Sequence, residues 1–258
     1  LHSLYQALMK HRASSGGLRC LTCYQTQNAS DALFATSLAG YFSSLALENP
    51  AFSWKVIATE STATGDTLAA QLLNEAAERT RGGSEIRYLQ ARAQSEASWQ
   101  RQINALRSYV PDEVPGAPVP LKQNGVYLIT GGMGGLGYLF AHYLVQHYQA
   151  TLVLTGRSAL DVAQQQRLEA LGAGGNTVVY LQADIADGAQ TDALIAESRR
   201  RFGAINGVIH CAGVNRDAFA RNKHKAEMAA VFAAKVQGTL NLDRATREDA
   251  LDIFVMFS

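Results

Sequence analysis

Residues 131–137 form a glycine-rich segment between an apolar run and a helical pattern. The apolar run is 126–130, and the segment reads Gly-Gly-Met-Gly-Gly-Leu-Gly. Glycine lets the backbone turn tightly and lets a pyrophosphate approach the amides at a helix N-terminus. A position between a strand and a helix favours a dinucleotide fingerprint over a purely structural turn, and no Gly-Lys-Ser/Thr follows that would make it a P-loop. The candidate cofactor residues here are Gly131, Gly132, Gly134, Gly135, Leu136 and Gly137.

Arg157 and Ser158 follow the next apolar run, residues 151–155. A site specific for NAD usually has an acidic residue at this point to bind the ribose hydroxyls, whereas an arginine fork suits a 2′-phosphate. The pair therefore predicts a preference for NADPH. The alternative is a solvent-exposed loop arginine.

Two further strand ends carry candidate residues. Asp184 and Ile185 follow the run 177–182, where an acid beside an apolar residue can hold an adenine edge; the alternative is that Asp184 caps the next helix. Cys211, Ala212 and Gly213 end the run that begins at residue 207, and their small size would let a ribose and a nicotinamide lie against the backbone.

The apolar runs alternate with helical patterns, which predicts an α/β fold with a doubly wound parallel sheet. Ligands bind such sheets at the carboxyl ends of the strands. Prolines concentrate in residues 111–120 and indicate a connection between two subdomains, 1–119 and 120–258. The first has a similar but shorter alternation, typical of a small parallel layer, without a glycine-rich turn. We expect it to be a truncated Rossmann-like unit with a structural role and no cofactor.

The composition excludes several classes of function. The formal net charge is +1, so nothing favours nucleic acid or an anionic membrane, and no apolar run is long enough to span a bilayer. Cys20 and Cys23 resemble half of a zinc site, but no second pair follows, and strand residues three apart face opposite sides. We expect no metal, reduced thiols and a cytoplasmic location. The chain begins with Leu1 and ends within an apolar run, which predicts a piece of a longer polypeptide.

The chain resembles the ketoreductase domain of a modular polyketide synthase, a relative of the short-chain dehydrogenases. The resemblance is carried by LITGGMGGLG at 128–137, LTGRS at 154–158, VIHCAGV at 208–214, AAKVQGTLNL at 233–242 and FVMFS at 254–258. In the first half, AGYFSSLALENP at 39–50 and EIRYLQAR at 85–92 resemble the family's structural subdomain. The resemblance implies NADPH-dependent reduction of a β-ketone on an acyl carrier protein, beside neighbouring synthase domains.

The resemblance also implies two catalytic residues. Ser258 matches the serine that hydrogen-bonds the ketone oxygen. Lys235 matches a lysine that tunes a tyrosine as proton donor, although a solvated helix lysine is the commoner fate of this residue type. The family's tyrosine and asparagine, spaced Y-x-x-x-N beyond the serine, have no match here. We therefore expect the parent protein to be active and this chain alone to be inactive.

Asp217 matches the last position of a fingerprint that implies a D-hydroxyl (B-type) product, but Asn215 and Arg216 do not match, and Asp217 can equally be a loop acid. Two other functions stay open. One is an inactive or scaffolding ketoreductase that binds cofactor without turnover. The other is a stand-alone short-chain reductase for small ketones.

Overall fold

The computed structural model describes residues 1–11, 17–26, 29–60, 63–78, 83–90, 99–105, 107–108 and 119–257. The chain divides into two compact units. One comprises Leu1–Asp112 with Phe219–Asn222, and the other comprises Glu113–Ala218 with Lys223–Ser258. Most of the proline-rich stretch at 111–120 lies outside the described residues.

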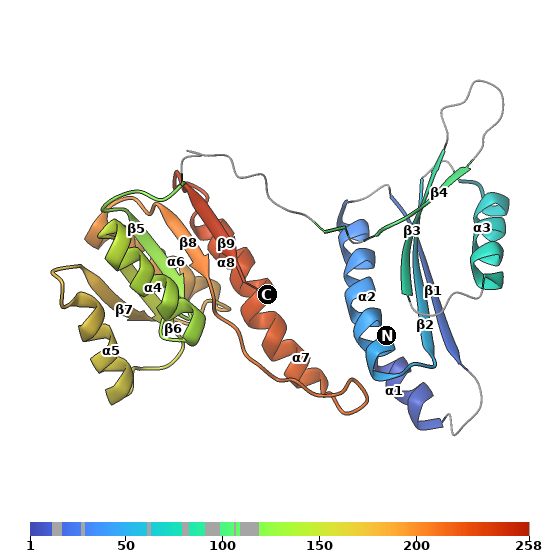
Figure 1. Ribbon diagram of the computed structural model, residues 1–258, viewed down its shortest axis with the longest axis horizontal. Coiled ribbons are helices and arrows are strands. Elements are labelled where there is room, and N and C mark those ends of the chain that lie inside the picture. The colour runs from blue at the N-terminus through green and yellow to red at the C-terminus, as the bar shows by residue number, and fades with distance from the viewer. Residues whose placement is uncertain are drawn as a thin grey trace. The chain divides into compact units, whose positions relative to one another are not determined.

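The second unit is built on a five-stranded parallel sheet in the order β7-β6-β5-β8-β9 (Figure 1). The strands are β5 (Val126–Thr130), β6 (Thr151–Gly156), β7 (Val178–Gln182), β8 (Gly207–His210) and β9 (Ile253–Met256). The chain moves outward from β5 on one side and then returns to add β8 on the other. The strand order therefore reverses at β5, and this is where ligands bind in doubly wound sheets.

Helices cover both faces of this sheet. They are α4 (Gly135–Tyr148), α5 (Val162–Gly172), α6 (Gly188–Phe202), α7 (Lys225–Phe232) and α8 (Gly238–Ala245), and a π-helix, η1 (Ala233–Gln237), joins the last two. Successive strand residues face opposite layers. Tyr127 and Ile129 pack with Leu144 of α4, whereas Leu128 packs with Leu194 of α6 on the other side. This two-sided burial explains why the strands are continuously apolar.

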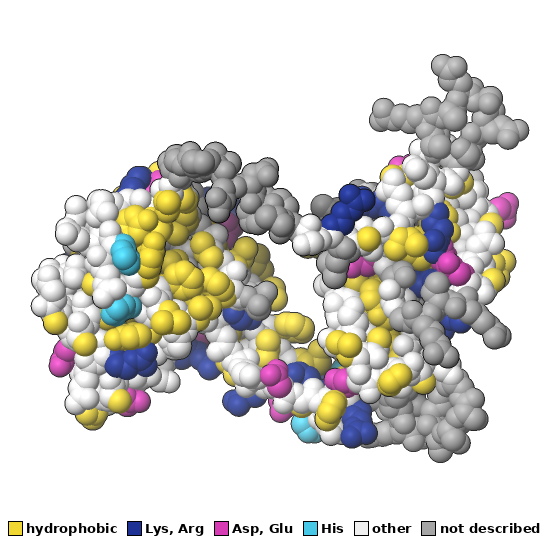
Figure 2. Space-filling view, viewed as in Figure 1, with side chains coloured by type: hydrophobic (Ala, Val, Ile, Leu, Met, Phe, Trp, Pro, Cys, Tyr) yellow, Lys and Arg dark blue, Asp and Glu magenta, His cyan; other side chains and the backbone are white. Residues whose placement is uncertain are grey.

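Helix α4 also has an apolar outer face. Leu136, Leu139 and Tyr143 are exposed there, and Figure 2 shows apolar side chains gathered over this helix. Ala141 and Leu144 are buried against the sheet. The helix therefore carries apolar side chains on both faces, with His142 and Gln146 also exposed on the outer one.

The first unit contains a four-stranded sheet in the order β1-β2-β3-β4. Its strands are β1 (Leu18–Gln25), β2 (Phe52–Thr59), β3 (Gly83–Gln90) and β4 (Trp99–Ile103), and its helices are α1 (His2–His11), α2 (Ala29–Glu48) and α3 (Gly65–Ala77). The first three strands are parallel, as expected, but β4 runs antiparallel to β3. The expected parallel layer is confirmed for β1 to β3, and β4, which the sequence pattern did not predict, adds an antiparallel edge.

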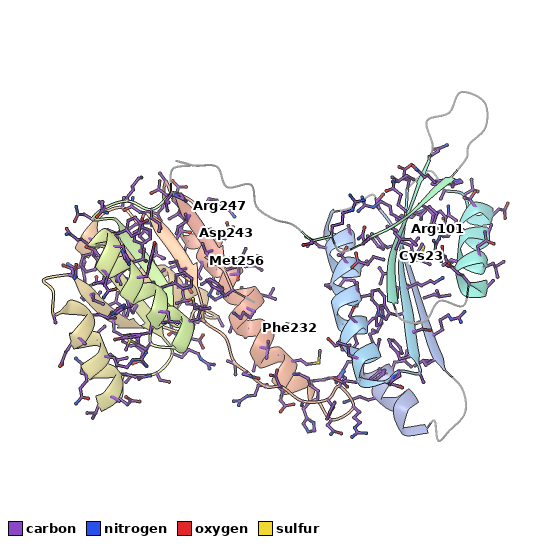
Figure 3. The ribbon with its side chains drawn as sticks, viewed as in Figure 1. Cys23, Arg101, Phe232, Asp243, Arg247 and Met256 are labelled. Carbon is purple, nitrogen blue, oxygen red and sulfur yellow. The ribbon has the colours of Figure 1, made fainter. Side chains whose placement is uncertain are left out.

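A buried ionic cluster joins β2, β3 and β4 to the end of α3. The carboxylate of Glu75 is 1% exposed and accepts hydrogen bonds from Lys55 Nζ (2.7 Å), Tyr88 Oη (2.7 Å) and Arg101 Nε (2.5 Å). Figure 3 labels Arg101, which reaches from β4 toward α3. Burial alone would raise the pKa of Glu75, but the hydrogen bonds from Arg101, Lys55 and Tyr88 outweigh it and lower the pKa to about 2.

Four residues from late in the chain, Phe219–Asn222, belong to the first unit. Ala220 is buried with Tyr5 and Phe52. Its amide donates to both carboxylate oxygens of Glu48, at 3.0 and 2.7 Å, and its carbonyl accepts from Gln6 Nε2 at 3.2 Å. Glu48 at the end of α2 therefore anchors this segment.

The three cysteines are unpaired thiols, and Cys20 and Cys23 both lie on β1. Within the described residues, no group of three or more His, Cys, Asp or Glu side chains could hold a metal ion. No helix among these residues is both long and apolar enough to cross a bilayer.

Candidate active site

The glycine-rich segment makes a tight turn between β5 and α4. Gly131 has a φ of +65°, and its amide donates to the carbonyl of Thr155 at 2.8 Å. A Cβ on Gly131 would come within 2.9 Å of the Ala212 backbone, and one on Gly137 within 2.4 Å of the Gly131 carbonyl oxygen. Gly134 is the N-cap of α4 and makes no side-chain hydrogen bond. The turn therefore requires glycine at positions 131 and 137. Because its N-cap is also a glycine, the start of α4 has no capping side chain.

A cleft of about 380 Å³ opens at the carboxyl ends of β5, β6, β7 and β8. Nine of the residues expected from the sequence line it: Gly131, Gly134, Arg157, Ser158, Asp184, Ile185, Cys211, Ala212 and Gly213. The cleft is also lined by Thr155, Gln164 and Tyr180, which the sequence analysis did not single out. Residues from four separate strand ends therefore share one concave site.

The other four predicted residues of the glycine-rich segment do not line the cleft. Gly132 and Gly137 are buried and serve close packing, since a Cβ on Gly132 would come within 2.8 Å of Leu154. Gly135 and Leu136 lie exposed in the first turn of α4. Of these four residues, only Gly132 and Gly137 have a close-packing role in the turn.

Asp184 does not cap the helix that follows it. Asp187 is the N-cap of α6, and its carboxylate accepts from the amides of Ala189 and Gln190. Asp184 instead accepts from the amide of Ala186 at 3.0 Å and lines the cleft. The capping alternative for Asp184 is therefore wrong.

Lys235 lies half-buried on the π-helix η1. Its Nζ donates to the carbonyl oxygen of Phe257, and a Cβ on Gly213 would come within 2.8 Å of its Cε. Lys235 thus packs directly against the cleft-lining turn after β8. Irregular turns of this kind are frequent at functional sites. Ser258 lies outside the described residues.

His210, which no sequence motif marks, connects the helix of Lys235 to the cleft. The carbonyl of Ala234 can only accept, so His210 Nε2 donates to it at 3.2 Å. Nδ1 then accepts from Thr130 Oγ1 at 2.6 Å, and that oxygen accepts from the amide of Ala212 at 3.2 Å. Burial lowers the pKa of His210, and the Lys235 ammonium lowers it further. The only trace in the sequence is a histidine at the end of an apolar run, and nothing there indicates its partners.

Asp217 is exposed and does not line the cleft. Its amide donates to Asn215 Oδ1 at 2.9 Å within the same loop. The structure therefore does not bring Asp217 together with the other predicted residues.

Comparison with known proteins identifies the family. The family described as "KR domain" matches residues 125–258. Polyketide synthase PksL of Bacillus subtilis is 37% identical over 86% of this chain, and polyketide synthase ThaG of Burkholderia thailandensis is 36% identical over 100%. The chain spans only 5% and 4% of these two relatives.

Solved structures agree with this result. A ketoreductase domain from the bacillaene assembly line superposes with a TM-score of 0.80 at 30% identity, over 100% of this chain and 58% of that one. An N-terminal ketoreductase from a macrolactin assembly line gives a TM-score of 0.73 at 31% identity, over 100% and 50%. The expected doubly wound, Rossmann-like α/β fold is confirmed, and the fold is one that binds a nicotinamide cofactor. The chain belongs to the KR-domain family, the ketoreductase domains of polyketide synthases.

Proposed function

We propose that this chain is the ketoreductase part of a synthase and that it reduces the β-ketone of an acyl chain carried on an acyl carrier protein, with NADPH as reductant. The observation that carries the proposal is the cleft at the switch point of the sheet. The glycine turn, Arg157 and the turn after β8 line it, and Lys235 packs against the last of these. Residues 120–258, apart from Phe219–Asn222, form the cofactor-binding catalytic subdomain, and residues 1–119 form a structural one. The three unpaired thiols suit a cytoplasmic location.

The residues of the cleft suit a nicotinamide dinucleotide. The amides at the start of α4 attract a pyrophosphate, because they have no capping side chain. Two turns that line the cleft need glycine, because a Cβ on Gly131 would clash with the Ala212 backbone and one on Gly213 with Lys235. Arg157 forms none of the ion pairs found among the described residues, so its guanidinium is available to a 2′-phosphate.

When bound, the reduced nicotinamide supplies a hydride to the ketone carbon, and a proton added to the ketone oxygen completes the alcohol. Lys235 holds a positive charge next to the turn after β8, where it favours negative charge developing on a nearby proton donor. Ser258, by its resemblance to the family serine, donates a hydrogen bond that polarises the ketone oxygen. Asp217 remains a proposed marker of a D-hydroxyl product, which chiral chromatography of the alcohol tests.

Cofactor titration tests the first half of the proposal. We expect the chain to bind NADPH more tightly than NADH, and Arg157→Ala to weaken NADPH binding by about ten- to a hundred-fold, because a hydrogen-bonded charge pair is lost. NADH binding should change little. Arg200→Ala, at an exposed arginine of α6, is the matched control. Equal affinity of the wild-type chain for both cofactors would contradict the NADPH assignment.

Turnover separates the three functions. In the parent synthase, we expect reduction of a carrier-bound β-ketone and loss of that activity in Lys235→Met. Cofactor binding without turnover in the parent would favour a scaffolding domain, and equal turnover of a free small ketone would favour a stand-alone reductase. For this chain alone we expect binding without turnover, because no tyrosine in it matches the family's proton donor.

A further inference from the structure

The loop that carries Arg157 is held by the neighbouring strand through three consecutive carbonyls. The carbonyl of Gly156 accepts from the amide of Ala183 at 3.0 Å. The carbonyl of Arg157 accepts from Gln182 Nε2 at 2.8 Å, and the carbonyl of Ser158 accepts from Tyr180 Oη at 2.6 Å. Only the first of these bonds is backbone to backbone.

Two side chains of β7 therefore hold the loop on the C-terminal side of the Arg157 Cα, and a backbone bond holds it on the N-terminal side. A peptide carbonyl that accepts a bond fixes the plane of its peptide group. The carbonyls of Gly156 and Arg157 lie in the two peptide groups that flank the Arg157 Cα, and the bond to Ser158 fixes the next peptide group, so the direction in which the Arg157 side chain leaves the backbone is restricted. The exposed guanidinium has no carboxylate partner among the described residues that would otherwise orient it.

Tyr180 is also fitted to the loop by shape. A Cβ on Gly156 would come within 2.9 Å of the Tyr180 hydroxyl, so the phenol lies directly beneath the loop. Tyr180 lines the same cleft as Arg157 and Ser158. Burial raises the pKa of Tyr180, so its hydroxyl stays protonated and donates at neutral pH.

We propose that Tyr180 and Gln182 are positioning residues for cofactor selection: by holding the carbonyls of Ser158 and Arg157, they direct the Arg157 guanidinium to the cofactor's 2′-phosphate. This inference rests on the proposed preference for NADPH and deepens it. A guanidinium held in one direction loses less entropy when it closes on a phosphate than one on a free loop. The two β7 side chains therefore contribute to the discrimination between NADPH and NADH without contact with the phosphate.

The test measures dissociation constants of NADPH and NADH for the whole chain and for Tyr180→Phe, Gln182→Met and the double variant. Each single variant removes one donor and little volume. We expect each to weaken NADPH binding by about five-fold, with NADH binding unchanged, and the double variant to approach Arg157→Ala. Tyr143→Phe on α4 and Gln165→Met on α5 are matched controls away from the loop and should change neither constant. The probes 2′,5′-ADP and 5′-AMP repeat the comparison without the nicotinamide.

The outcomes distinguish this inference from the proposed function. If the wild-type chain prefers NADPH through Arg157 but the β7 variants leave the ratio of the two constants unchanged, the positioning role is wrong and the cofactor assignment stands. An equal loss for both cofactors, with lowered thermal stability, would reduce Tyr180 and Gln182 to structural support. If the wild-type chain shows no preference, or binds neither cofactor, the proposed function fails and this inference fails with it.

Discussion

His210 does not line the cleft, but its ring bonds to two residues that do, Thr130 and Ala234. Its ring accepts from Thr130 and donates to Ala234, so it links the end of β5 to the π-helix that carries Lys235. The two bonds require a neutral ring with its proton on Nε2. The glycines, Arg157 and Lys235 were identifiable from the sequence because their types and spacing match a chemical task. His210 was not, because its role depends on partners 80 and 24 residues away.

We expect His210→Phe to lower the free energy of unfolding by about 1–3 kcal/mol, because it leaves Thr130 and Ala234 without buried partners. His210→Gln, which keeps a donor and an acceptor, should recover part of the loss.

The pKa of His210 is lowered from 6.5 in the folded chain. Its contribution to stability is therefore complete above that value and decreases as the pH falls below it, since only the unfolded chain takes up the proton. Denaturant unfolding at pH 7.5 and 5.5 measures this. If the free energy of unfolding falls as much from pH 7.5 to pH 5.5 in His210→Gln as in the wild type, His210 is not the group responsible.

At the scale of elements, the parallel strands of the second unit were predictable and the irregular elements were not. Continuous apolar runs between glycine and polar turns mark β5 to β9 clearly, because both faces of the sheet are covered. Strand β4, with the sequence WQRQI, lacks both an apolar run and alternation, because Trp99 is its only residue that is not exposed. The π-helix lies within a segment whose periodicity predicts one helix over 228–245. A single extra residue in a turn leaves almost no trace in such a pattern.

The ionic cluster at the end of α3 makes a prediction for the first unit. Glu75→Gln should destabilise this unit by about 3–5 kcal/mol, because Lys55 would stay buried with part of its counter-charge removed. Glu78→Gln is the matched control, since Glu78 contacts the same two cations but is 43% exposed, and we expect a loss below about 1 kcal/mol. The folded pKa of Glu75 is about 2 against 4.5 unfolded, so its contribution is complete above pH 4.5 and decreases as the pH falls toward 2. If Glu75→Gln and Glu78→Gln lower the free energy of unfolding equally, the burial of Glu75 does not determine the size of its contribution.

At the scale of the whole molecule, the chain contains two units with separate cores, and the candidate cleft is lined by residues of the second unit alone. The order of the strands in the sequence predicts which strand ends converge. It does not predict that Phe219–Asn222 belong to the first unit. That assignment depends on Glu48 and Gln6, which are 172 and 214 residues away from Ala220. No local pattern in the sequence encodes contacts of that range.

Both tryptophans, Trp54 and Trp99, lie in the first unit, so their fluorescence reports on that unit selectively. We expect Glu75→Gln to lower the midpoint of the tryptophan-detected unfolding transition and to leave the dissociation constant of NADPH unchanged, because no cleft-lining residue belongs to the first unit. Saturating NADPH, at about 100 times its dissociation constant, should stabilise the second unit by about 2.7 kcal/mol, measured by far-ultraviolet circular dichroism. Arg157→Ala should reduce that stabilisation at the same NADPH concentration without moving the tryptophan transition. A parallel loss of NADPH affinity in Glu75→Gln would mean that the ionic cluster of the first unit supports the cofactor cleft.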